Sequence, residues 1–146
     1  MLPDKTALQD IAKDISSRSL INDRNATLDR KAWGALAASG LWRIPVSREH
    51  GGFGGTWQQC ISSIDTVAQG CADLGFLVTM LGHIGSIKLL IDYGTERQKT
   101  LWLPRLLNGE IAAGLIDGIT SLAISRIHSR EAFGKKLSEF QYIRGR

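Results

Sequence analysis

The chain is poor in the residues that cross-link or interrupt a fold. Its 146 residues include two cysteines and three prolines, and aromatic residues make up 7%. Cys60 and Cys71 lie in a stretch that reads as helix, where they would be about 16 Å apart along the axis, too far for a disulfide. With no CxxC motif and no Cys/His cluster, we expect no metal site and a reducing compartment.

A targeting segment is also missing from the sequence. The first ten residues include Asp4 and Asp10 and no apolar run, so neither a signal peptide nor an Arg-rich transit peptide is predicted, and the expected location is cytoplasmic. The longest apolar stretch, residues 74–91, approaches the length of a membrane span but contains His83, Lys88 and three glycines. We therefore expect a buried helix of a globular domain there, and no membrane span.

Excess charge is confined to one end of the chain. The formal net charge is +4, and residues 118–146 carry six Lys or Arg against two Asp or Glu, whereas residues 1–117 are balanced. A basic end could neutralise nucleic-acid phosphates. Because it has no repeat of aromatic and basic residues, a solvated helix face is favoured and no nucleic-acid partner is expected.

Helical periodicity dominates the first forty residues. The first predicted helix ends near Asn22, and a second begins after Asp29, which can cap it, and stops at Gly40. Their predicted apolar stripes are Leu8, Ile11, Ala12 and Ile15 on the first helix and Trp33, Leu36 and Ala37 on the second.

A glycine-rich segment follows the second helix. Pro45 blocks helix formation, and residues 51–55 contain four glycines. The segment is either a functional loop or an ordinary turn. A phosphate-binding loop is not favoured, because no Gly-Lys-Ser/Thr follows and no strand precedes it.

Two capping boxes predict the next helix starts. Thr56 with Gln59 and Thr95 with Gln98 have the spacing in which each side chain bonds to the backbone N–H of the other residue. The first helix is predicted to run to about Ala72, with Ile61, Ile64, Val67 and Ala68 facing inward. The other carries Leu101, Trp102 and Leu106, and Pro104 is expected to kink it.

Between them a predicted helix spans residues 73–93. Its glycines, Gly75, Gly82 and Gly85, each cost about 1 kcal/mol relative to alanine, so either close helix packing or room for a ligand must offset them. A last helix is predicted from near Ile116 to Gly134, followed by a partial helix over 138–146. No convincing strand is present, and the predicted fold class is all-α.

Three segments in this order resemble the acyl-CoA dehydrogenase family of FAD enzymes. The first, GLWRIPVSREHGGFGGTWQQ, is similar to the family's helix-to-loop pattern ahead of its third helix. The second, IDYGTERQKTLWLPRLLNGE, is similar to its Gly-Thr-Glu-x-Gln-Lys helix with Leu-Pro and a closing Gly-Glu. The third, SREAFGKKLSEFQYIRG, is similar to the Arg-x-x-Phe-Gly-Lys and Phe-Gln pattern that opens its C-terminal helical domain.

The resemblance implies a helical bundle of two parts. Residues 1–113 would form the family's N-terminal helical domain, and residues 114–146 the start of its C-terminal domain. The sequence passes from one to the other without the family's middle β domain and with only the beginning of the C-terminal domain. We therefore expect a truncated form without independent turnover.

The resemblance also implies candidate site residues. FAD contacts would come from Arg130, Phe133 and Gln141, and an acyl chain would lie against Met80, Leu81 and Ile84. No catalytic residue is expected, because the family's catalytic Glu positions have no counterpart here. Glu110 and Asp117 flank the junction, but a solvated carboxylate is the favoured interpretation of both.

Three functions remain open at this stage. One is the family reaction, FAD-dependent α,β-dehydrogenation of an acyl-CoA or acyl-carrier thioester, carried out only with a partner that supplies the β domain. Another is a helical interaction module that binds itself or an intact family member, because an apolar face without its usual cover needs a partner. The third is acyl-chain binding without chemistry, suggested by the glycines of the central helix.

Overall fold

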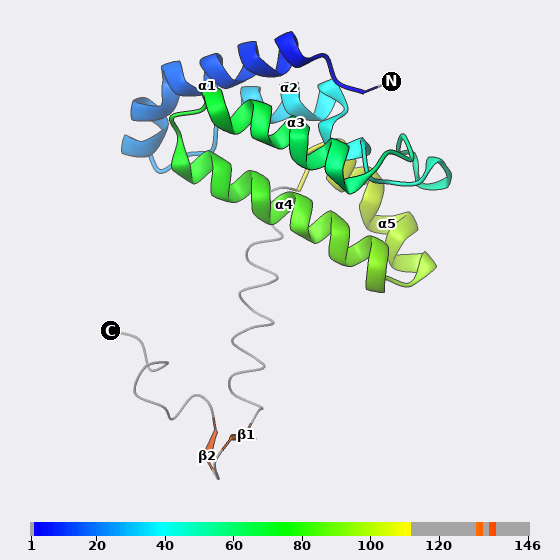
Figure 1. Ribbon diagram of the computed structural model, residues 1–146. Helices are drawn as coiled ribbons and strands as arrows, with labels where there is room; N and C mark the ends of the chain where they lie inside the picture. Colours follow the sequence, from blue (N-terminus) through cyan, green and yellow to red (C-terminus); the bar gives the residue numbers. More distant parts are fainter. Residues whose placement is uncertain (1, 112–130, 133–134, 137–146) are drawn as a thin grey trace. The chain divides into compact units, whose positions relative to one another are not determined.

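The computed structural model describes residues 2–111, 131–132 and 135–136 of the chain. They fall into two compact units, residues 1–112 and 113–146, which are considered separately. The first unit contains five α-helices and two short 3-10 helices, shown in Figure 1. The all-α fold class predicted from sequence is confirmed. The predicted division at residue 113 between two family domains stays a prediction.

The first two helices start and stop where local signals place them. Helix α1 spans Lys5–Arg24, and α2 spans Arg30–Ser39. Asp29 accepts a hydrogen bond from the Ala32 backbone N–H, and Gly40 ends α2 in the left-handed conformation at φ 83°. The predicted cap and stop of α2 are therefore confirmed.

Two short 3-10 helices occupy the glycine-rich segment, η1 at Leu41–Arg43 and η2 at Arg48–His50. Gly52 lies so close to the main chain at Val46 that a Cβ there would meet the Val46 carbonyl oxygen at 2.0 Å. No other residue fits this approach.

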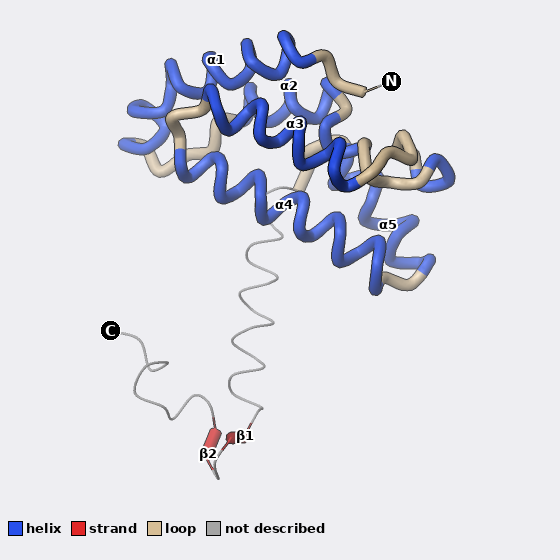
Figure 2. The backbone as a smooth tube through the Cα atoms, viewed as in Figure 1, coloured by secondary structure: helices blue, strands red, loops and turns tan. Residues whose placement is uncertain are grey.

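The remaining helices are α3 at Trp57–Gly70, α4 at Leu74–Tyr93 and α5 at Glu96–Leu107. Both predicted capping boxes are present, and α5 continues through Pro104 to Leu107. Figure 2 shows that short loops connect these helices. In the packing, α1 contacts α2 and α3, and α4 contacts α5.

The second unit departs from prediction where it is described. Glu131–Ala132 and Lys135–Lys136 form strands β1 and β2, which pair antiparallel. We expected helix up to Gly134, so the helical assignment of Glu131 and Ala132 is wrong. Local apolar spacing around Ile119, Ala123 and Ile127 predicted the helix, whereas a ladder of backbone hydrogen bonds between two short segments is a pairing that such spacing cannot reveal. The predicted helix over 138–146 lies outside the described residues.

On α3 the predicted inward residues Ile64 and Val67 are confirmed, and on α5 Leu106 is buried, but the residues beside them differ from those that the sequence singled out. On α3 the buried residues are Cys60, Ile64 and Val67, while Ile61 is 54% exposed. On α5, Leu103, Leu106 and Leu107 are buried, whereas Leu101 and Trp102 are exposed. The differences arise at Ile61, Leu101 and Trp102, because several apolar residues lie close together there and contact with the partner helices selects which of them is buried.

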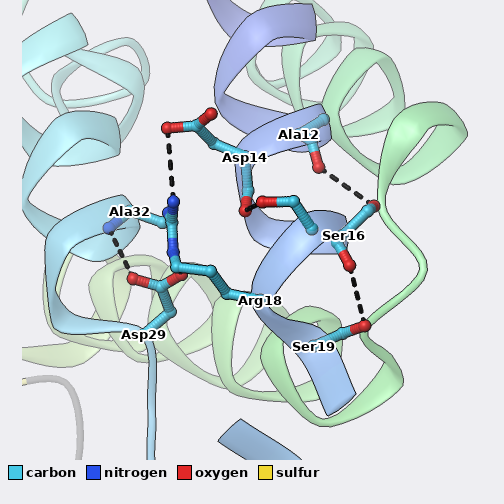
Figure 3. Close-up of polar contacts among 8 residues, drawn as sticks. Ala12, Asp14, Ser16, Arg18, Ser19, Asp29 and Ala32 are labelled. Carbon is cyan, nitrogen blue, oxygen red and sulfur yellow. Dashed lines mark hydrogen bonds and ion pairs between the residues drawn. The ribbon is translucent and has the colours of Figure 1, made fainter. Parts of the chain in front are cut away.

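An ion pair joins α1 to the start of α2. The Nε of Arg18 donates to Asp29 Oδ2 at 2.7 Å, and the other Asp29 oxygen accepts from Ala32 (Figure 3). Burial acts to raise the pKa of Asp29, but the Ala32 N–H and the Arg18 guanidinium outweigh it and hold that pKa below its usual value. The carboxylate therefore stays ionised and holds two helices together.

Candidate functional site

The central helix α4 connects the core to an open surface. Its inner side carries Phe76, Met80, His83, Ile84, Ser86 and Ile87, all buried. Its outer side carries Val78, Leu81 and Leu89, each more than half exposed. A helix that is apolar all round is normally covered on every side. Within residues 2–111, the outer side of α4 has no such cover.

His83 is the polar centre of the core. Its ring contacts Trp33 of α2 edge-on at 4.9 Å and Trp42 of η1 at 4.7 Å, measured between ring centroids. Nε2 lies 3.0 Å from the carbonyl oxygen of Leu106 in α5. A carbonyl can only accept, so Nε2 carries the proton and Nδ1 is the bare nitrogen. Four elements therefore meet at a neutral imidazole.

Burial lowers the pKa of His83 to about 4, although its bond to the Leu106 carbonyl acts in the opposite direction. At neutral pH the ring is uncharged. Among the described residues, Nδ1 has no hydrogen-bond partner. His83 is enclosed by aromatic rings and is only 1% exposed. Its imidazole therefore cannot reach a substrate to act as an acid or base. We assign it a structural role.

The predicted acyl-contact residues divide between the two sides of α4. Met80 is 0% exposed and Ile84 5%, so both lie in the core, while Leu81 is 54% exposed and points away from it. The structure does not bring the three together on one surface, because successive helical residues are separated by about 100° around the axis. Whether any of them contacts an acyl chain stays a prediction.

Two glycines open the surface next to Leu81. A Cβ built on Gly82 or Gly85 would meet no atom within 4 Å in the described structure. Of the two explanations offered for these glycines, close helix packing is not seen among residues 2–111. Val78 and Leu89 extend the same surface, and sequence reasoning missed them, although their spacing from Gly82 and Gly85 was available as a signal.

The glycine-rich segment at 51–55 does not form a phosphate cradle. The backbone N–H groups of Phe53, Gly54 and Gly55 donate to the carbonyls of Arg43, Val46 and Ile44 at 2.7–2.8 Å. The N–H of Gly52 donates to Ser47 at 2.9 Å. These donors are used by the loop itself, so an anion cannot bind to them without breaking the loop.

Neither of two cavities lined by described residues fits a flavin dinucleotide. One, of about 470 Å³, lies between the end of α1 and the start of α4, and its wall includes Asp23, Asp29 and Asp73. These carboxylates would repel the diphosphate of FAD. The other, of about 350 Å³ and lined by Arg43, His50 and Lys99, is at the low end of the volume of a small-ligand pocket.

The remaining candidates give no further site within the described residues. Arg130, Phe133 and Gln141, the predicted FAD contacts, lie outside them, as does Asp117. Glu110 is exposed and 3.7 Å from the Nε of Arg105. No cluster of three potential metal ligands occurs in the described part. Both cysteines are free, and burial raises the pKa of Cys60 to about 11, which makes its thiol unreactive.

One helix in the described residues, Leu74–Tyr93, is long and apolar enough to cross a membrane by length and composition. Its mean hydropathy is 1.8, and 33% of the window is buried inside the fold. Core helices of globular proteins pass the same test. The contacts of His83 and Met80 place the inner side of this helix in such a core.

Two known proteins are similar to about half of the chain. The chain is 29% identical over 75 residues to a 3-sulfinopropanoyl-CoA desulfinase of Cupriavidus necator, a match that covers 51% of this chain and 19% of that protein. It is 34% identical over 77 residues to a (2S)-methylsuccinyl-CoA dehydrogenase of Cereibacter sphaeroides, covering 53% of this chain and 14% of the relative. No solved structure matches significantly.

The matches therefore span less than a fifth of each relative's length. The family profile described as "Acyl-CoA dehydrogenase, N-terminal domain" matches residues 3–110, which is most of the chain and nearly all of its first compact unit. On this evidence the chain belongs to the acyl-CoA dehydrogenase family.

Proposed function

We propose that this chain is a helical unit of an FAD-dependent assembly that acts on acyl-CoA or acyl-carrier thioesters, and that it does not turn over substrate alone. The observation that carries the proposal is the uncovered apolar outer side of α4, a surface that a further part must complete. Both relatives are named for CoA thioesters, which supports this substrate class.

The completing part would supply the flavin site. Arg130, Phe133 and Gln141 are the residues of this chain proposed to contact FAD, through the cofactor's anionic half in the case of Arg130. When bound, the flavin supplies the electron acceptor for α,β-dehydrogenation. Another polypeptide, or another part of a longer protein, would provide the rest of the site.

An acyl chain would lie on the outer side of α4. Of the three residues predicted from sequence, Leu81 is the one that a ligand can reach, and the open positions at Gly82 and Gly85 leave room beside it. Met80 and Ile84 would then not contact the acyl chain; their packing in the core would hold α4 in position. Apolar contact at Leu81 is worth about tenfold in affinity if its side chain becomes fully covered.

Titration of the purified chain with palmitoyl-CoA tests this proposal. Leu81→Gln should weaken binding about tenfold, as estimated from the loss of one apolar contact. Ile61→Gln is the matched control, because Ile61 has the same exposed fraction, 54%, on a different helix. Equal affinities of the two variants, or no binding by the unmodified chain, would refute the acyl contact.

Independent turnover is tested with FAD and octanoyl-CoA added to the chain alone. We expect the flavin to stay oxidised. Reduction of the flavin by the chain without any added protein would overturn the proposal that another part is required.

A second candidate function, association with another protein molecule, is favoured by the length of the open face. Exposed apolar residues continue from Leu74 to Tyr93, beyond the contact that an acyl chain at Leu81 requires. A second molecule can cover a face of this length.

A further inference from the structure

The exposed side of α4 carries a row of uncharged residues at regular helical spacing. We use the name outer strip for six residues that follow one another at helical spacing: Leu74, Val78, Gly82, Gly85, Leu89 and Tyr93. The four with large side chains are 56–81% exposed, and none of the six is charged. The buried residues of α4 lie on the opposite side of the helix.

The outer strip is symmetric about the middle of its helix. The midpoint of Leu74–Tyr93 falls between His83 and Ile84. Gly82 and Gly85 lie equally far from that point, as do Val78 and Leu89, and as do Leu74 and Tyr93. If a second α4 packs antiparallel with this midpoint on a two-fold axis, each member of a pair meets the other member in the second molecule.

A two-fold dimer requires such a surface. The same patch must be used by both molecules, so every contact occurs twice with the two residues exchanged. In this register large side chains meet large ones toward the ends, and the glycines meet at the centre. The open positions at Gly82 and Gly85 allow the two helix axes to approach closely at their crossing point.

Charge at the helix ends is complementary in the same arrangement. Asp92 lies at the C-terminal end of α4, where the negative end of the helix dipole makes a carboxylate unfavourable. Its Oδ2 is 2.6 Å from the Nζ of Lys88. In the antiparallel pair, Asp92 is opposite Gly75 of the second copy, at the positive N-terminal end of that helix. A parallel pair would bring the two Asp92 carboxylates together instead.

We propose that the outer strip is a docking surface for a second copy of this chain, bound antiparallel about a two-fold axis through the midpoint of α4. The inference rests on the proposed function in one respect: both treat the outer side of α4 as a surface to be completed. A second copy and an acyl chain would therefore exclude each other at Gly82 and Gly85. A helix of this length is about 30 Å long, so the contact is small and the expected dissociation constant is in the micromolar range.

Disulfide cross-linking tests the register. In a Cys71→Ser background, a Val78→Cys chain mixed with a Leu89→Cys chain should form a disulfide dimer under mild oxidation. Val78→Cys alone is the matched control, because two copies of residue 78 would be about 16 Å apart along the axis in this register, too far for a disulfide. Equal cross-linking of the control would refute the antiparallel register.

Light scattering over a concentration series tests the dimer itself. We expect a shift from monomer to dimer across the micromolar range, and a dissociation constant at least tenfold higher for Gly85→Leu. Leucine favours helix more than glycine and meets open space in the monomer, so this variant should unfold at a higher temperature while it dimerises less. A monomer at all concentrations, or a monomer that floats with phosphatidylcholine vesicles, would overturn the inference.

The two proposals can fail separately. Loss of dimerisation with palmitoyl-CoA binding intact would remove the second copy and leave the thioester function standing. If the chain dimerises at high concentration but the monomer, below the dissociation constant, binds no palmitoyl-CoA, the thioester function is removed and the docking surface is left.

Discussion

The inner and outer sides of α4 are both apolar, yet they have opposite surroundings. On the inner side Met80, His83 and Ile87 are buried, and the His83 ring contacts residues of α2, η1 and α5, while on the outer side Val78, Leu81 and Leu89 face solvent. Apolar composition alone therefore does not say which residues stabilise this fold. The comparison separates residues that hold the unit together from those available to a ligand or partner.

The largest loss of stability should come from truncating a buried side chain on the inner side of α4. Met80→Ala removes a fully buried side chain, and because such changes leave a cavity we expect the free energy of unfolding to fall by about 2–5 kcal/mol. Urea unfolding followed by tryptophan fluorescence measures it, at concentrations that keep the chain monomeric. A loss no greater than that of an outer-side substitution would contradict the division of α4.

Acid should weaken the inner side next. The folded pKa of His83 is about 4, below its ordinary value of 6.5, so the unfolded chain binds more protons between these values. This contribution is complete above pH 6.5 and is lost as the pH falls toward 4, a loss of about 3 kcal/mol from the linkage relation.

The pH dependence is measured by urea unfolding at a series of pH values. His83→Gln is the control, because it keeps a polar side chain of similar reach but does not titrate, and its stability should be flat from pH 6.5 down to about 4.5. Asp29 loses its contribution only below its ordinary pKa of 3.8, whereas Glu96 begins to lose its contribution near its ordinary pKa of 4.5, equally in the control and in the unmodified chain. An equal slope in the control would show that another group titrates.

Glycine replacement on the outer side should act in the opposite direction. Gly82→Ala adds a methyl group in open space and removes the entropy cost of glycine in a helix, so we expect the monomer to gain about 1 kcal/mol. Thermal unfolding of the dilute chain measures the gain. A loss of stability would contradict the open position of Gly82.

The smallest effect should come from truncating the outer side. Leu81→Ala shortens a side chain that is 54% exposed, so the free energy of unfolding should change by less than about 0.5 kcal/mol. The same chemical denaturation assay applies. A loss comparable with that of Met80→Ala would place Leu81 in a core and break the comparison.

Much of the fold could be predicted because its signals are local. The capping boxes at Thr56 and Thr95, the cap at Asp29 and the stop at Gly40 each depend on hydrogen bonds within a few residues, and all are present. Inward faces were predicted less well. Ile61 adjoins Cys60, and Leu101 lies two residues before Leu103; only contact with neighbouring helices selects which residue of each pair is buried.

The candidate site was predictable in position but not in orientation. Sequence reasoning identified the stretch around Met80, Leu81 and Ile84 together with its glycines, and the structure places one of the three residues on the open side. The proposed FAD contacts, Arg130, Phe133 and Gln141, depend on a motif resemblance and remain predictions. The pair of strands at Glu131–Ala132 and Lys135–Lys136 was missed, because two-residue strands have too few positions to show an alternating pattern.

The sequence by itself determined the family, the helix boundaries and the apolar character of α4, since motifs and caps depend on residues that are close together in the chain. Only the tertiary structure decided which side of α4 is covered. A helix that is apolar all round has no preferred inner side of its own, so its orientation follows from the partners that pack against it. Here those partners, Trp33, Trp42 and Leu106, come from three other segments of the chain.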